Sequence, residues 1–209
     1  MDNGLQLRSF ARFLYTQNPF YLISCFLILY GLQIAAVAHS DLFSRSIMLS
    51  GGIVAYTLLM SVTCVAVVRL CKVWDDARSI FLIVAISFVA FSIGLDELCV
   101  VDWNSAAMIM AGGALLTVVV TESLLRFCRL KLSFLFRLSF YLLMAVFFAT
   151  PLALGRAVAE RADGLTNWGA MLFSIAIAAA LLFLIPAVRR GAEQVQNNGS
   201  PWSWPLYPM

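Results

Sequence analysis

The sequence predicts an all-α, polytopic transmembrane helical bundle with six spans, and three observations support that prediction. Six apolar stretches, most of them close to the ~20 residues that cross a bilayer, fill most of the 209-residue chain. Hydrophobic residues make up 62% of the chain and charged residues 12%, about half the charged share of an ordinary soluble domain. The basic residues gather in alternate links between the stretches, as the topology of short membrane loops requires.

The first three spans follow one another with short links. The apolar run at about 20–38 is too long for a secretory signal and lacks a small-residue cleavage site, so we interpret it as an uncleaved first span. The second span, at about 47–68, forms a helical hairpin with it. The third, at about 80–95, is short, and we therefore expect the flanking Asp96 and Glu97 at the water interface or in a thinned region.

The last three spans are expected at about 106–125, 134–154 and 168–188. Pro186 should bend or end the sixth span, because proline cannot donate the backbone hydrogen bond of a helix interior. Residues 191–209 form a tail rich in aromatic residues and proline, which we expect on the membrane surface. The links are too short to hold a soluble domain, so we interpret residues 1–190 as a single transmembrane domain.

The distribution of basic residues predicts the orientation. Eleven of the fourteen Lys and Arg residues lie before the first span, in the second and fourth links, or after the sixth span. The opposite side holds only Arg45, Arg156 and Arg161, together with a wholly acidic third link. This bias predicts that both termini are cytoplasmic, and we expect a multi-pass protein of a bacterial cytoplasmic (inner) membrane.

One carboxylate lies clearly inside an apolar span. Glu122 is about one turn from the end of the fourth span, and Arg126 follows at i+4 on the same helical face, so we expect a local ion pair. The alternative is a proton or cation site, because an ionised side chain in a span is costly and is a functional candidate by default. Gln33 and Asp96 are the other polar residues that a route across the bilayer could use.

A second candidate site precedes the third span. Trp74, Asp75, Asp76 and Arg78 lie next to one another in the sequence. Asp75 or Asp76 can cap the following helix, and Trp74 can anchor at the headgroups. The alternative is a cytoplasmic docking site for a partner or a lipid.

Other chemistry is not predicted. Three consecutive residues, His39, Ser40 and Asp41, cannot reproduce the geometry of a catalytic triad. The five cysteines form no CxxC pair and no metal-ligand pattern, and we interpret them as small apolar-like residues, with Cys99 on the outer side. The sequence has no basic run, so nucleic acid is not an expected partner. We therefore expect no catalytic residue, metal or cofactor site.

Two glycine pairs indicate close helix contacts: Gly51-Gly52 and Gly112-Gly113.

Four short motifs resemble those of a family of uncharacterised bacterial multi-pass membrane proteins. They are Asn18-Pro19-Phe20-Tyr21, Leu29-Tyr30-Gly31-Leu32, Trp74-Asp75-Asp76-Ala77-Arg78 and Pro201-Trp202-Ser203-Trp204-Pro205. The motifs are spread over most of the chain. The resemblance implies a multi-pass membrane fold and no established activity or site residue, and we expect other members of the family to be longer.

The leading functional prediction is a non-enzymatic subunit or scaffold of a membrane assembly, because the sequence has neither a soluble domain nor a convergent polar centre. The expected partners are the lipid bilayer and other membrane subunits, or further copies of the chain. The alternative is a component of a small-solute or proton-coupled transporter that uses Glu122, Gln33 and Asp96. A membrane-bound enzyme ranks only third, because the polar cluster that such an enzyme needs is missing from the sequence.

Overall fold

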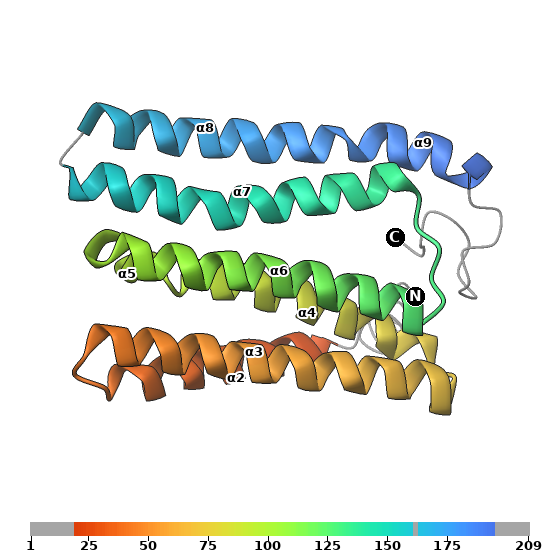
Figure 1. The fold of residues 1–209 in the computed structure, drawn as a ribbon. Coiled ribbons are helices and arrows are strands. Elements are labelled where there is room, and N and C mark those ends of the chain that lie inside the picture. The colour runs from red at the N-terminus through yellow and green to blue at the C-terminus, as the bar shows by residue number, and fades with distance from the viewer. Residues whose placement is uncertain (1–18, 161–162, 195–209) are drawn as a thin grey trace, which may run out of the picture.

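The computed structural model describes residues 19–160 and 163–194, and this part of the chain is helical without any strand (Figure 1). In chain order the elements are α2 (Pro19–Val37), α3 (Leu42–Ala66), the π-helical turn η1 (Val67–Cys71), α4 (Trp74–Ile93), α5 (Asp96–Val101), α6 (Trp103–Phe127), α7 (Phe134–Ala159), α8 (Asp163–Leu182) and α9 (Leu184–Gln194). The predicted all-α class is confirmed. Residues 1–18, 161–162 and 195–209, which include Arg8, Arg12, Arg161, most of the predicted tail and the last of the four motifs, lie outside the described residues.

All six predicted apolar stretches are helical. Five segments are long and apolar enough to cross a membrane, and the first apolar helix, Tyr21–Val37, is shorter. The third stretch differs most from expectation, because its apolar segment runs over Asp76–Val101 rather than 80–95. Hydropathy marks only the apolar turns, whereas the backbone hydrogen bonds of α4 continue through the polar residues before them.

Successive long helices run in opposite directions, so the links gather at two ends of the bundle (Figure 1). We call these the basic end and the acidic end. Among the described residues, the basic end carries Arg69, Lys72, Arg78, Arg126, Arg129, Lys131, Arg137 and Arg189. The acidic end carries Asp41, Asp96, Glu97, Asp102 and Glu160. Arg45 and Arg156, the described basic residues there, each pair with a carboxylate of that end.

The core lies around α4. In an 18-residue apolar window of Asp76–Val101 half of the residues are buried, against 11% in the corresponding window of Trp168–Arg189, so α4 is central and α8 peripheral. α4 contacts α2, α3, α6 and α7, whereas α8 packs chiefly on α7. Both glycine pairs contribute close contacts: Gly52 faces Leu32 of α2, and Gly113 faces Phe91 of α4 and Phe148 of α7. Close helix contact is thus found at the second glycine of each pair.

Aspartates cap two helices at the acidic end. The Asp41 carboxylate accepts a hydrogen bond from the Ser44 amide at 2.9 Å at the start of α3, and Asp102 accepts one from the Ser105 amide at 3.2 Å at the start of α6. Hydrogen bonds from Ser44 and Ser105 lower the pKa of the respective carboxyl group, because they favour its charged form. Both helices therefore begin at an ionised cap.

This geometry predicts a pH dependence at the start of α6. The pKa of Asp102 is lower in the folded chain than the ~3.9 of an unfolded one, so the cap contributes fully above about pH 4 and is lost as the pH falls through the lower folded value. We expect the hydrogen-exchange protection factor of the Ser105 amide to fall in that acidic range. In Asp102→Asn, which retains a capping oxygen but does not titrate, protection should not change with pH, and an identical fall in both proteins would contradict the assignment.

A proline inside α7 explains a hydrogen bond between helices. Pro151 has no N–H to donate to the carbonyl of Phe147, which lies four residues earlier. The hydroxyl of Ser92, buried on α4, donates to that carbonyl instead. A serine on a neighbouring helix thus satisfies the backbone group that the proline releases, as apolar surroundings require.

Replacing Ser92 with alanine should therefore destabilise the bundle, and the loss should depend on Pro151. We expect Ser92→Ala to lower the free energy of unfolding by about 1–2 kcal/mol, since it leaves a buried carbonyl unsatisfied. In a Pro151→Ala background the helix can supply its own donor, so the same change should cost clearly less. Unfolding measured in mild detergent for the four proteins gives the coupling energy, and a value of zero would contradict this interpretation.

Candidate functional site

A charged cluster joins α6 to α7 near the basic end. The Nη1 atom of Arg137 lies 3.4 and 3.5 Å from the two carboxylate oxygens of Glu122, and the hydroxyl of Tyr141 donates to the same carboxylate at 2.8 Å. The Glu122 and Arg137 side chains are each about one-third exposed. Arg137 and Tyr141 are four residues apart on α7, which places both on the helix face toward Glu122.

The prediction that Arg126 pairs with Glu122 was wrong. Arg126 makes no ion pair with it in the described structure, and Arg126 is exposed. The carboxylate turns toward α7, where a guanidinium and a phenol hydroxyl can both bind it. A link of six residues, 128–133, folds α6 and α7 into an antiparallel hairpin and brings these positions level with one another.

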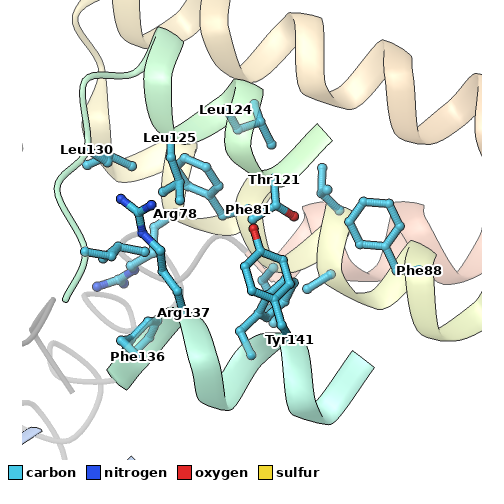
Figure 2. Close-up of a pocket in the computed structure, with 15 residues that line it drawn as sticks. Arg78, Phe81, Phe88, Thr121, Leu124, Leu125, Leu130, Phe136, Arg137 and Tyr141 are labelled. Atoms are coloured by element: carbon cyan, nitrogen blue, oxygen red, sulfur yellow. The ribbon is translucent and has the colours of Figure 1, made fainter. Parts of the chain in front are cut away.

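Next to the cluster lies a cavity of about 320 Å³ between α4, α6 and α7 (Figure 2). Its walls are almost wholly apolar and include Phe81, Phe88, Leu124 and Phe140. Arg78 of α4 and Arg137 of α7 line its end nearest the link, and Tyr141 lines its side. The cavity is thus apolar, and the side chains of two arginines line one end of it.

One hydrogen-bond donor of the cluster has no acceptor among the described residues. The Nε atom of Arg137 is buried and is the one buried side-chain nitrogen or oxygen, among the described residues, without a hydrogen-bond partner. A buried donor without an acceptor is costly, and native structures contain few of them. The cluster can therefore hold two helices together and still offer a hydrogen bond to an acceptor.

The other polar candidates lie elsewhere. Gln33 is exposed on α2, and Asp96 is exposed at the start of α5. Asp96 lines a separate cavity of about 650 Å³ between α5, α7 and α8 at the acidic end. From Asp102 at the start of α6 to Glu122 the helix advances about 30 Å, at ~1.5 Å per residue. Asp96 and Glu122 are thus near opposite ends of the bundle, and the structure does not bring the candidates together.

The predicted docking segment forms the first turns of α4. Trp74 is half-buried, and Arg78 reaches the cavity. The expected capping by an aspartate was wrong, because α4 begins earlier than the apolar pattern indicates and its N-cap is Val73, which makes no side-chain cap. Asp76 instead lies in the first turn, where a negative charge favours the positive end of the helix, and the side chain of Asp75 lies outside the described part of the structure.

The cysteines lie apart from this charged cluster and form no disulfide among the described residues. All described cysteines are free, and Cys99 is fully buried against α7. The described residues contain no group of three His, Cys, Asp or Glu side chains that could hold a metal ion. The cluster of Glu122, Arg137 and Tyr141 is the principal candidate site.

The chain matches no family model, no curated protein and no solved structure. Its function is therefore inferred from the residues and their geometry. Sequence reasoning found Glu122 but missed Arg137 and Tyr141. Two features of the sequence could have identified them. Arg137 and Tyr141 are spaced i, i+4, and they follow the link by four and eight residues, on either side of the six residues by which Glu122 precedes it.

Proposed function

We propose that the chain is an integral membrane protein of a bacterial cytoplasmic membrane, acting as a non-enzymatic subunit or scaffold of a membrane assembly. Large apolar side chains are exposed on every long helix, and soluble monomers rarely expose contiguous surfaces of this kind. Examples on four helices are Leu59, Leu115, Leu142 and Leu172. A bilayer covers such a surface.

The observation that carries the scaffold role is the pairing of Glu122. Its carboxylate is bound by two side chains of the neighbouring helix, so it is engaged in holding α6 against α7. Transport would need a polar route, and Gln33 and Asp96 lie apart from this cluster. α8 supports an assembly role, because it packs chiefly on α7 and leaves apolar side chains such as Leu172 and Ile175 open to a lipid or a partner helix.

Assembly can be tested on the purified protein. After expression and extraction in mild detergent, we expect the chain to stay in the membrane fraction during alkaline carbonate washing and to elute at a protein mass greater than one copy, measured by light scattering with correction for detergent. A lone monomer that turns over a small molecule would contradict the scaffold role. Release by carbonate would contradict membrane insertion itself.

The proposed orientation has its own test. Cys99 is buried and unsuitable for labelling, whereas Cys71 is exposed at the basic end and Asn104 at the acidic end. In cysteine-free backgrounds, a membrane-impermeant thiol reagent should label Asn104→Cys in intact spheroplasts. A protein retaining only Cys71 should be labelled only after lysis, because the excess of basic residues keeps that end cytoplasmic. The reverse pattern would overturn the orientation.

A further inference from the structure

The cavity between α5, α7 and α8 at the acidic end has the size and the lining of a small-molecule site. Its volume of about 650 Å³ falls within the ~300–1,000 Å³ of typical ligand pockets. Phe147 of α7 and Phe173 of α8 form its aromatic part, and their rings meet edge to face with centroids 5.7 Å apart. Asp96, Glu97 and Thr150 are the lining residues with polar side chains. Ligand pockets characteristically join an apolar body to a few polar groups that fix the orientation of the ligand.

The charge of Asp96 is not balanced by any described basic residue. Two such residues lie at this end, and each pairs with another carboxylate. Arg45 binds Glu97 at 3.3 Å, and Arg156 binds Glu160 at 2.9 Å. The Asp96 carboxylate accepts a hydrogen bond from the Glu97 amide at 2.7 Å, and a carboxylate has lone pairs for further donors. The lining of the cavity therefore favours a cationic ligand over a neutral or anionic one.

The short helix α5 places Asp96 on the side of the cavity. Asp96 and Val100 are four residues apart, so they share one face of α5, and both line the cavity. Cys99 of the same helix packs against Gly155 of α7, which is another lining residue, and the charge of Asp96 acts on the Cys99 thiol. The carboxylate thus lies on the part of α5 that faces α7.

The aromatic part of the cavity lies deeper in the bundle than the carboxylate. The hydroxyl of Ser92 donates to the carbonyl of Phe147, which places these two residues at the same level. The chain runs toward the acidic end through α4, and Asp96 follows Ser92 by four residues, which is about one helical turn. A ligand with a charged group at one end and an aromatic ring at the other matches this order.

We propose that this cavity binds an amphiphilic amine that carries an aromatic ring, with its ammonium group on Asp96 and its ring against Phe147 and Phe173. The ammonium group donates a charge-assisted hydrogen bond to the carboxylate and balances its charge. The ring packs edge to face on the aromatic pair, an arrangement that aromatic rings prefer. The site goes beyond the scaffold function and does not depend on it, because the cavity lies within one copy of the chain.

Equilibrium dialysis tests the charge preference. The protein, purified in dodecyl maltoside, is dialysed against 4-phenylbutylamine or the neutral 4-phenylbutanol, and binding is measured as the excess over protein-free micelles. We expect one amine per chain to bind saturably and several-fold more tightly than the alcohol. Asp96→Asn should weaken amine binding about fivefold, as expected for the loss of one partly exposed ion pair, and should leave alcohol binding unchanged. Asp41→Asn is the matched control, because it removes a carboxylate from the same end without lining the cavity and retains a capping oxygen.

A second pair of variants tests the interior. Ala170 lines the cavity, whereas Ala178 lies about two turns further along α8 and does not, and both are exposed. Ala170→Phe should abolish binding of both compounds, and Ala178→Phe should preserve it. Equal binding in these two variants, or no saturable binding to the wild type, would overturn the proposal. Equal binding of the amine and the alcohol, or equal effects of Asp96→Asn and Asp41→Asn, would overturn the role of Asp96. Carbonate washing and light scattering test insertion and assembly separately from all of these outcomes.

Discussion

Replacing Gly155 with valine is expected to remove most of the folded protein. A Cβ atom at this position of α7 would lie 2.7 Å from the backbone carbon and oxygen of Cys99 in α5. Real Cβ atoms essentially never come that close, and backbone atoms cannot rotate away as the end of a side chain can. We expect a loss in free energy of unfolding of about 3 kcal/mol or more, at the upper end of the overpacking range.

The matched control is Gly112→Val in α6. Gly112 is exposed, and no atom lies within 4 Å of an added Cβ. Both variants place valine in a helix, so the intrinsic helix preference changes equally and only the packing differs. Thermal unfolding in mild detergent and the yield of monodisperse protein should separate them clearly. Similar melting temperatures for the two variants would mean that α5 does not rest on α7 as the structure places it.

The contact of Gly155 with Cys99 also shows which parts of the fold the sequence could predict. The long helices were predictable, because a membrane span needs an apolar length that hydropathy measures directly. The short helix Asp96–Val101 was not, since it begins with two acidic residues and its position depends on a glycine more than fifty residues later. Hydropathy contains no information on which helices touch.

The last apolar stretch gives a similar lesson. Pro186 was expected to bend or end the sixth span, and the structure breaks that span after Leu182 and resumes as α9 (Leu184–Gln194). Pro186 lies in the first turn of α9, where the lack of an N–H costs little. A proline in an apolar stretch thus predicts that the helix is interrupted. The residue at which the helix ends depends on which helix start can accommodate the proline in its first turn.

The candidate site was half predictable for the same reason. A single carboxylate in an apolar span is visible in the sequence, so Glu122 was found. Arg126 was predicted as its partner because, without a known fold, a contact can be inferred only from the spacing of residues along a single helix. The true partners, Arg137 and Tyr141, come from the next helix and depend on the register of the α6–α7 hairpin.

Arg137→Leu is expected to destabilise the bundle by about 2 kcal/mol. The change leaves the Glu122 carboxylate with only the Tyr141 hydroxyl. Breaking a fully buried pair costs about 3–5 kcal/mol, and a smaller loss is expected here because both side chains are about one-third exposed. Arg126→Leu removes the same charge from the same end of the bundle and should change the free energy of unfolding by less than about 0.5 kcal/mol, as at an ordinary surface position.

The decisive comparison adds Glu122→Gln to Arg137→Leu. Glutamine is neutral and can still accept the hydrogen bond from Tyr141, so the double variant should recover most of the stability that Arg137→Leu loses. Chemical unfolding of the four proteins in mild detergent measures this coupling. If Glu122 instead carries protons, Glu122→Gln alone should abolish a pH-dependent conformational signal without changing assembly or stability, and that result would favour the transporter alternative. Recovery in the double variant would assign the Glu122–Arg137 pair to holding α6 and α7 together.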